Sequence, residues 1–327
     1  MAQDRFRVVR GSAIVTGGAG FIGSHVVDAL LGDGLQVAVI DDLSSGEERR
    51  VAAEAEMCVV DIVDRTALEA VVRRVKPRAI YHLAAQASVV ASVEDPGRDC
   101  DVNVRGTLNV LESARLVGAP VVFTSTGGAL YGDAAPMPTP EDQIPAPLSP
   151  YGASKWAAEA FVNTWSLSGE QSHSVCRLGN VYGPRQSPHG EAGVVAIFSY
   201  HLFAARTPKL YGHGRPTRDY VYVADVVSAL LAASGRSGTY NIATASETDV
   251  ATIWRVLQQV AEGSGHGAAA TGERIEPELA DLRPGELQHS CLDVSLAARE
   301  LGWRPAVNID EGLRLTYEAL AEEFQAA

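Results

Sequence analysis

A glycine-rich turn near the start of the chain constrains the fold more than any other feature. The apolar run at residues 13–15 is typical of a buried strand, and residues 16–23 (TGGAGFIG) lead directly from it into a helical pattern. Glycines 17, 20 and 23 allow a tight turn, a close approach of the backbone to a pyrophosphate, and close packing of helix on strand. Free N–H groups at the helix start stabilise phosphate charge. The unit predicts a dinucleotide-binding fold.

An acidic residue at the end of the next strand indicates which dinucleotide. The second apolar run covers residues 37–40, and Asp41 closes it, 18 residues after Gly23. A carboxylate there accepts hydrogen bonds from an adenosine ribose and repels a 2′-phosphate, which favours NAD over NADP. Taken alone, Asp41 could equally be a solvated acid at a strand end, so the prediction depends on the glycine turn before it.

Strands and helices alternate through the first half of the chain. Such alternation predicts βαβ units and a parallel sheet. The expected strands are residues 13–15, 37–40, 58–60, 79–82, 121–124 and 174–177, and the expected helices are 21–33, 65–75, 97–117 and 151–168. We therefore expect an α/β fold: a Rossmann-like, doubly wound parallel sheet with a smaller, mixed α/β substrate-binding lobe.

The regular alternation of strand and helix patterns ends after residue 180, which suggests a domain boundary. We expect an NAD-binding domain over residues 1–179 and a substrate lobe over 180–327, with a segment near 215–245 returning to the first domain. The Gly/Ala-rich stretch beginning at residue 262 is the best candidate for a mobile loop.

Composition excludes several classes of partner. The 327 residues carry a formal net charge of −13, which disfavours nucleic acid and anionic membranes as partners. No apolar run approaches the length of a membrane span, and the N-terminus lacks the apolar core of a signal peptide. The four cysteines show no CxxC pairing, so no metal site is expected and a reducing, cytoplasmic location fits.

A tyrosine and a lysine four residues apart form the strongest catalytic candidate. Tyr151 and Lys155 share one face at the start of an expected helix, directly after Pro150. A phenol with a pKa of about 10 is a poor base, but an ammonium one turn away favours the phenolate. The pair could then act as a general acid–base. A chance surface pair is the alternative, yet Lys155 is one of only three lysines.

Hydroxyl groups at the end of the fifth expected strand could complete the site. Thr124, Ser125 and Thr126 end that strand, where side chains point into the cleft of such a fold. Thr126 is the candidate to hold a substrate hydroxyl against the tyrosine. These hydroxyls could also merely cap the next turn, which is a common duty of Ser and Thr.

The ordered motifs resemble a known family. The chain is similar to extended short-chain dehydrogenases/reductases, specifically to NAD-dependent sugar-nucleotide epimerases of the UDP-glucose 4-epimerase type. The resemblance covers almost the whole chain and rests on residues 16–25, 41–44, 61–62, 81–86, 101–107, 125–132, 151–155, 180–185, 214–221, 283–286 and 301–305.

That resemblance implies roles for individual residues. Those expected to bind NAD are Gly17, Gly20, Phe21, Ile22, Asp41, Asp42, Leu43, Ser44, Asp61, Ile62, Leu83, Ala84, Ala85, Asn103, Thr124, Tyr151 and Lys155. Those expected to contact a UDP-sugar are Ser125, Thr126, Tyr151, Asn180, Arg218, Arg283, Glu286 and Ser290. Thr126, Tyr151 and Lys155 would be catalytic. Leu178 stands where many members carry an aromatic residue, so packing at the nicotinamide end should differ.

The resemblance further implies 4-epimerisation of a UDP-hexose through a 4-keto sugar, by a homodimer with tightly held NAD. In the resembling family the helices near 97–117 and 151–168 pair with their copies. The apolar residues on them exceed what one inner face requires: Val104, Leu108, Val110, Leu111, Trp156, Ala157, Ala160 and Phe161. Ser290 is small at a position that borders the sugar, so N-acetylated hexoses are also expected substrates. The alternatives are a UDP-glucuronate 4-epimerase, a dehydratase or decarboxylase of the same superfamily, and a non-catalytic NAD sensor. Gly127 and Gly128 lie where the dehydratases and decarboxylases carry acids, and a sensor would be expected to lack Tyr151 or Lys155.

Overall fold

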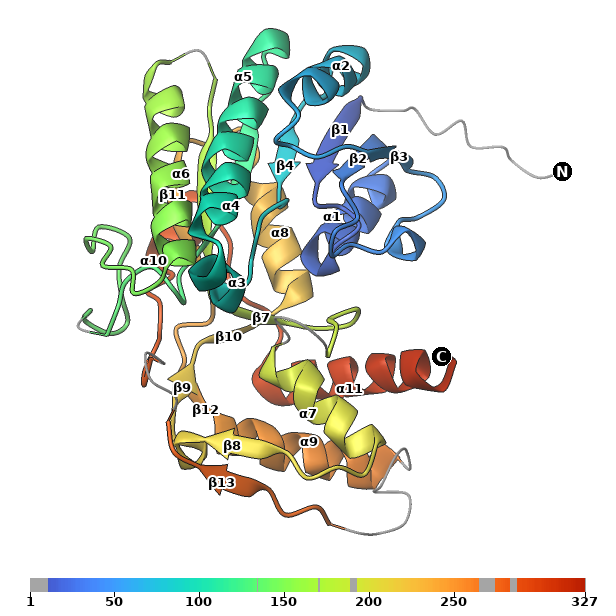
Figure 1. Ribbon diagram of the computed structural model, residues 1–327, viewed down its shortest axis with the longest axis vertical. Helices are drawn as coiled ribbons and strands as arrows, with labels where there is room; N and C mark the ends of the chain where they lie inside the picture. Colours follow the sequence, from blue (N-terminus) through green and yellow to red (C-terminus); the bar gives the residue numbers. More distant parts are fainter. Residues whose placement is uncertain are drawn as a thin grey trace, which may run out of the picture.

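A computed structural model describes residues 11–133, 135–169, 171–188, 193–264, 274–282 and 287–326. A seven-stranded, fully parallel sheet lies at the centre of its larger part (Figure 1), in the order β11-β6-β5-β4-β1-β2-β3. Its strands are β1 (Ser12–Thr16), β2 (Gln36–Asp41), β3 (Glu56–Val59), β4 (Ile80–His82), β5 (Val121–Thr126), β6 (Ser174–Leu178) and β11 (Gly238–Ile242). The strand order reverses between β1 and β4, where open α/β sheets bind ligands.

Helices cover both faces of this sheet, because alternate strand residues are apolar on both sides. On one face lie α1 (Phe21–Gly32), α8 (Val223–Ala233) and α10 (Ser295–Glu300). On the other lie α2 (Arg65–Val75), α5 (Thr107–Val117) and α6 (Pro150–Leu167). Neighbours in β1 show the alternation: Val15 packs in the first core and Ile14 in the second, both fully buried. The predicted fold class is confirmed.

The expected helix over residues 97–117 is divided by a wider turn. It consists of α4 (Pro96–Cys100), the π-helical turn η2 (Asp101–Gly106) and α5, preceded by the short helix α3 (Val89–Glu94). The Thr107 hydroxyl donates to the Asn103 carbonyl at 2.6 Å and so occupies an acceptor inside this turn. The turn places the Asn103 side chain in the interior, where it is 1% exposed.

The smaller lobe packs helices against short strands around a separate core. It contains α7 (Val194–Phe203), α9 (Val250–Ser264), α11 (Ile309–Ala326), and the paired strands β8 (Lys209–Tyr211) and β13 (Glu278–Ala280). Two small sheets connect the lobes: β7 (Asn180–Tyr182) with β10 (Tyr220–Tyr222), and β9 (Thr217–Arg218) with β12 (Thr248–Asp249). Single 3-10 turns are η1 (Glu48–Arg50) and η3 (Gly212–Gly214).

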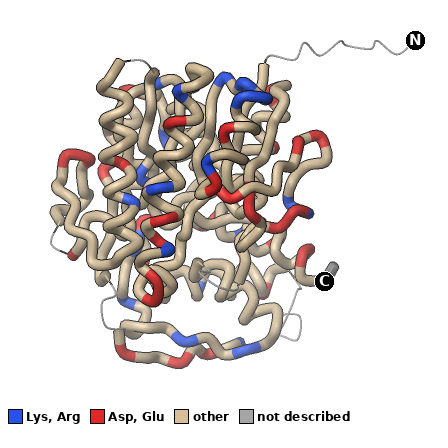
Figure 2. Tube along the Cα trace, turned by 45° about the horizontal axis from the view of Figure 1, so that its top comes forward, with Lys and Arg blue, Asp and Glu red and all other residues tan. Residues whose placement is uncertain are grey.

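Two local expectations differ from the structure. β11 is a seventh strand that the apolar pattern did not single out, because Thr239 and Asn241 interrupt its apolar residues. The expected loop from residue 262 is helical as far as Ser264, where α9 ends, and residues 265–270 lie outside the described ranges. Acidic and basic segments are interspersed along the described chain (Figure 2). No described helix is both long and apolar enough to cross a membrane.

Candidate active site

A cleft of about 630 Å³ opens beside the carboxyl ends of the central strands. Its walls come from the glycine turn, the ends of β2, β4 and β5, and the start of α6. The predicted residues that line it are Gly17, Gly20, Phe21, Ile22, Asp41, Asp42, Ser44, Asp61, Ile62, Leu83, Ala84, Ala85, Thr124, Ser125, Tyr151 and Lys155. The fold thus brings residues more than a hundred positions apart in the sequence into one cavity.

The glycine turn folds so tightly that a side chain at either of two positions would strike neighbouring backbone. Gly17 has a φ of +70°, and a Cβ there would lie 2.6 Å from the Ala84 nitrogen. A Cβ on Gly23 would overlap the Gly17 carbonyl. Helix α1 begins at Phe21 with Gly20 as its N-cap, and no side chain caps its first N–H groups. Those donors are left to an anionic ligand, as the geometry of a pyrophosphate site requires.

Asp41 has a structural duty that the sequence did not reveal. Its carboxylate is 7% exposed and accepts hydrogen bonds from the backbone nitrogens of Ala19, at 3.0 Å, and Leu43, at 2.9 Å. Burial raises the pKa of Asp41, while these two backbone donors oppose the rise. The residue therefore ties the glycine turn to the end of β2 as well as facing the cleft.

Tyr151 and Lys155 are presented by a well-capped helix start. The Ser149 hydroxyl accepts from the Gly152 nitrogen at 3.2 Å, and Pro150 occupies the first helical turn. Lys155 is 3% exposed, and its Nζ lies 4.4 Å from the centre of the Phe123 ring. Burial lowers the pKa of Lys155 to about 8, against the opposing influence of Glu159 and Asp99. The pKa of Lys155 therefore lies much closer to neutral pH than that of an exposed lysine.

A buried histidine lies behind this pair in a chain of hydrogen bonds. The Thr107 hydroxyl gives its only proton to the Asn103 carbonyl, so it must accept from His82 Nε2, at 2.9 Å. His82 Nδ1 then accepts from Thr16 Oγ1 at 2.7 Å, and Thr16 accepts from the Ala84 nitrogen. Burial, with Lys155 nearby, lowers the pKa of His82 to about 3. The imidazole is therefore neutral with its proton on Nε2.

The three hydroxyls that end β5 have different surroundings. Thr124 donates to the His82 carbonyl at 3.0 Å. Thr126 accepts from the Ala129 nitrogen at 3.1 Å and so caps the following turn, although its own proton remains available. The buried Ser125 hydroxyl lines the cleft and has no hydrogen-bond partner within the described residues. Ser125 is therefore as well placed as Thr126 to bind a ligand hydroxyl.

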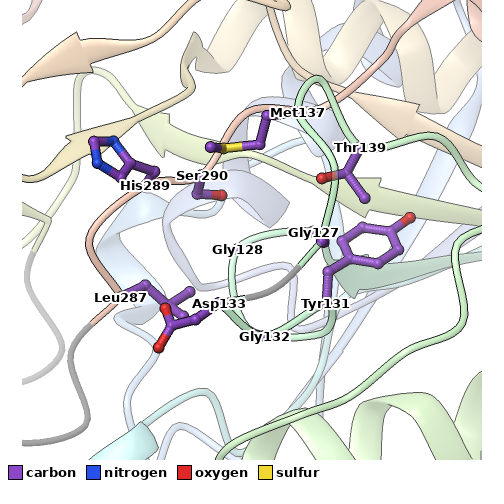
Figure 3. Close-up of a pocket in the computed structure, with 11 residues that line it drawn as sticks. Gly127, Gly128, Tyr131, Gly132, Asp133, Met137, Thr139, Leu287, His289 and Ser290 are labelled. Carbon is purple, nitrogen blue, oxygen red and sulfur yellow. The ribbon is translucent and has the colours of Figure 1, made fainter.

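A second, much smaller pocket of about 10 Å³ adjoins the end of β5 (Figure 3). Ser290 lies on the segment that faces the loop of Gly127, Gly128 and Gly132, and Met137 and Tyr131 complete the wall. Ser125 lines the large cleft and Gly127 lines the small cavity, so Thr126 lies between the two. Neighbouring atoms pack closely against these glycines: a Cβ on Gly132 would lie 2.6 Å from the Ala146 carbonyl oxygen.

The remaining predicted residues lie apart from the large cleft. Leu43 and Asn103 stand just behind its wall, and Asn180 and Arg218 belong to β7 and β9 at the junction of the lobes. Arg283 and Glu286 fall outside the described residues. Leu178 does line the cleft. Sequence reasoning missed Gln86 and Ser88, which line it too, because small polar residues in a loop carry no distinctive spacing.

A glycine-rich turn with uncapped N–H groups for an anion, beside a Tyr–Lys pair, defines a dinucleotide-dependent enzyme that acts on a hydroxyl group. A family model described as GDP-mannose 4,6 dehydratase matches residues 14–316. A UDP-glucose 4-epimerase of Mycolicibacterium smegmatis is 44% identical, over 95% of this chain and 99% of that protein. The chain belongs to the NAD-dependent epimerase/dehydratase family, within the UDP-glucose 4-epimerase type.

Solved structures agree with this assignment. A UDP-glucose 4-epimerase from Thermotoga maritima with UDP-glucose superimposes with a TM-score of 0.90 at 41% identity, covering 96% of this chain and 99% of that one. A Thermus thermophilus UDP-glucose 4-epimerase in complex with NAD gives a TM-score of 0.85 at 41% identity, covering 94% and 98%.

Proposed function

We propose that this protein is a UDP-hexose 4-epimerase that uses NAD. The observation that carries the proposal is that Tyr151 and Lys155 line the same cleft as the glycine turn and Asp41. The cradle fits the cofactor, because Gly17 and Gly23 let the backbone of the turn fold tightly and the first N–H groups of α1 carry no side-chain cap. NAD+ held there would supply the hydride acceptor for C4 of the sugar and, once reduced, the hydride donor.

The chain's own residues move the proton and hold the substrate. Tyr151 takes the proton of the C4 hydroxyl and gives it back at the end of the cycle. Lys155 stabilises the phenolate by its charge. Thr126 or Ser125 donates a hydrogen bond to the C4 oxygen as negative charge develops there. Asn180, Arg218, Arg283 and Glu286 hold the UDP portion while the 4-keto sugar turns over.

The rival reactions on this fold find less support. A dehydratase or decarboxylase needs an acid after the β5 hydroxyls, where Gly127 and Gly128 stand. A uronic acid needs a cation for its carboxylate, and the motif candidate, Arg185, pairs with Asp28 of α1 at 2.6 Å. A non-catalytic sensor has no need of a buried lysine beside a tyrosine in the cleft.

The direct experiment is to incubate the purified protein with UDP-glucose or UDP-galactose and to quantify both sugars with time. We expect the same equilibrium mixture from either direction without added NAD. Cofactor binding without any interconversion would instead identify a sensor, and a product lacking the C6 hydroxyl or carboxylate would identify one of the rival reactions.

Asp41 should determine the choice of cofactor. Replacing it by Asn removes the charge that repels a 2′-phosphate, so the preference for NAD over NADP should narrow by at least about tenfold. The dissociation constants of both dinucleotides, measured by calorimetry, test this. The exposed Asp33→Asn in the α1 cap is the matched control and should leave the ratio unchanged. A parent protein that binds NADP as tightly as NAD would contradict the role.

Ser290 should set the breadth of substrates. Ser290 has a small side chain at the position that the resemblance places beside the sugar. We therefore expect the space there to admit an N-acetyl group, and activity on UDP-GlcNAc and UDP-GalNAc as well. Ser290→Tyr fills this space and should lower the ratio of N-acetylhexosamine to hexose turnover at least about tenfold, because overpacking excludes the larger sugar. Ser290→Ala should keep the ratio. An unchanged ratio in the tyrosine variant would refute the gate.

We also propose a homodimer that pairs through α5 and α6, and a cytoplasmic location in keeping with four free cysteines. The exposed stripe of α6 consists of Ala153, Trp156, Ala160, Thr164 and Leu167, with no charged residue among them. Trp156 is 41% and Leu167 is 87% exposed. Two residues that the sequence suggested for this interface, Val110 and Leu111, pack in the core of the subunit instead.

Trp156→Glu should convert the dimer to a monomer, because it places a charge in the middle of the apolar stripe. Light scattering at micromolar concentration measures the mass. Leu279→Glu is the control, since Leu279 is 57% exposed on β13 in the other lobe. A parent protein that is already monomeric, or a Trp156→Glu variant that remains dimeric, would refute this interface.

A further inference from the structure

Asp99 is a buried carboxylate for which the proposed mechanism has no use. It lies in α4 behind the wall of the cleft and is 1% exposed. It accepts hydrogen bonds from Gln86 Nε2 at 2.7 Å and from Asn103 Nδ2 at 3.2 Å. Burying a carboxylate is costly unless its surroundings compensate the charge. No ion pair joins Asp99 to a cation within 4 Å anywhere in the described part of the chain.

Backbone groups independently fix the orientation of both amides. Gln86 Oε1 accepts from the Ser88 nitrogen, and Gln86 Nε2 donates to the Ser88 carbonyl. Asn103 Oδ1 accepts from the Gln86 nitrogen, and Asn103 Nδ2 donates to the Gln86 carbonyl. Both NH₂ groups therefore face Asp99, which accepts from them. This is the pattern of an ionised carboxylate. Gln86 Nε2 makes the shorter bond, whereas Asn103 Nδ2 shares its two hydrogens among three acceptors, of which Asp99 is the most distant.

The same hydrogen bonds continue to the catalytic helix. Asn103 Nδ2 also donates to Ser154 Oγ at 3.0 Å, and Ser154 donates to the Tyr151 carbonyl at 3.0 Å. Gln86 belongs to the loop after β4 that lines the cleft. Asp99 thus anchors, through two amides, both the cofactor-facing loop and the first turn of α6.

The charges around Lys155 give Asp99 a second role. Lys155 is buried against Phe123, and the ionisable groups near it are His82 of β4, Asp99 of α4, and Tyr151 and Glu159 of α6. His82 is neutral. Arg177 of β6 neutralises Glu159 through a buried ion pair of 2.7 Å. Asp99 is left as the nearby negative charge without a cation of its own. Helix α4, which carries Asp99, packs against α6, which carries Lys155. Glu159 and, to a smaller extent, Asp99 raise the pKa of Lys155 against the effect of burial.

We propose that Asp99 is a positioning residue of this site, whose carboxylate orients Gln86 and Asn103 and supplies the buried counter-charge that keeps Lys155 protonated beside Tyr151. The charge pairing is a property of the folded chain. Its consequence for turnover rests on the proposed function, so the two need separate measurements.

A double-mutant cycle on stability tests the pairing without any activity assay. Lys155→Met should leave Asp99 uncompensated, and Asp99→Asn should leave Lys155 uncompensated, so each single variant should be less stable than the parent. The stability lost in the double variant should be smaller than the sum of the losses in the two single variants. We expect the difference to be at least about tenfold in the unfolding equilibrium constant. Additive losses would overturn the pairing. If Asp99→Asn alone does not fold, a folded double variant supports the pairing, and a double variant that also fails to fold overturns it.

The pH dependence of turnover tests the consequence for catalysis. Loss of the Asp99 charge makes the Lys155 ammonium easier to deprotonate, so the alkaline fall of kcat in Asp99→Asn should move to lower pH by about one unit. Glu94→Gln, which removes an exposed charge from the neighbouring α3, should leave the profile unchanged. A uniform loss of kcat with an unmoved alkaline limb would show that Asp99 only positions. A parent protein without epimerase activity would refute the proposed function and leave the stability cycle to decide the pairing.

Discussion

Replacing Tyr151 by Phe should lower turnover at least about 100-fold while the protein keeps its cofactor and its UDP-sugar affinity. The ring remains in the cleft at the start of α6, so packing is preserved and only the hydroxyl that carries the proton is lost. A positioned general acid–base contributes a factor of this size or more. Initial rates of UDP-galactose conversion, together with the amount of NAD bound after purification, measure the two effects separately.

Tyr240→Phe is the matched control. Tyr240 is a buried tyrosine of β11 whose hydroxyl bonds to the Ser237 carbonyl at 3.0 Å, so this variant loses a hydroxyl outside the cleft. It should lose stability by about 1 kcal/mol and keep its rate. If Tyr151→Phe turns over within a few-fold of the parent, Tyr151 is not the acid–base of this enzyme.

The second large effect concerns Gly23→Ala, which should abolish cofactor binding. A methyl group there would overlap the Gly17 carbonyl, and Gly17 itself already lies against the backbone of Ala84. The turn cannot yield without moving the N–H groups that face the pyrophosphate. Overpacking between backbone atoms of this kind costs about 1–3 kcal/mol in stability before any ligand is considered.

The content of bound NAD and the thermal unfolding midpoint measure this prediction, with Gly32→Ala as control. Gly32 ends the same helix, and a Cβ there meets nothing within 4 Å. That variant should bind NAD normally and unfold at the same or a slightly higher temperature, because Ala favours a helix. Equal NAD content in Gly23→Ala and the parent would contradict this prediction, because the turn would then accept a methyl group without losing its cofactor.

The sequence predicted the elements that have a local residue pattern, such as an apolar run or a glycine spacing. It missed the elements that depend on packing between distant parts of the chain. The glycine turn follows from its spacing and six of the seven central strands from their apolar runs. The spacing of Tyr151 and Lys155 was a weak signal by itself, and the two residues do line the same cleft. β11 was not predicted, because polar residues interrupt it and the sheet covers them only in the folded state. The interior position of Asp99 was equally invisible, since its two partners come from a loop and from a π-helical turn that no periodicity announces.

The sequence also could not tell which apolar residues of a helix lie in the subunit core and which are exposed. An excess of apolar residues on α5 and α6 suggested a partner surface, and Trp156 and Leu167 are indeed exposed. Val110 and Leu111 are needed inside, because α5 lies between α2 and α6 and packs on the sheet. Helical periodicity says which residues share a face, but which of two faces is covered by the rest of the chain is decided only by the assembled layers.

The hydrogen-bond chain through His82 cannot carry a proton between the site and the solvent. One end of the chain is a peptide carbonyl, at Asn103, and the other is a peptide nitrogen, at Ala84. Peptide groups neither release nor take up protons at ordinary pH, so the chain is closed at both ends and cannot conduct. An isomerisation neither consumes nor produces a proton. The centre can therefore return the same proton to every molecule that it converts, and its interior needs no conduit to the solvent.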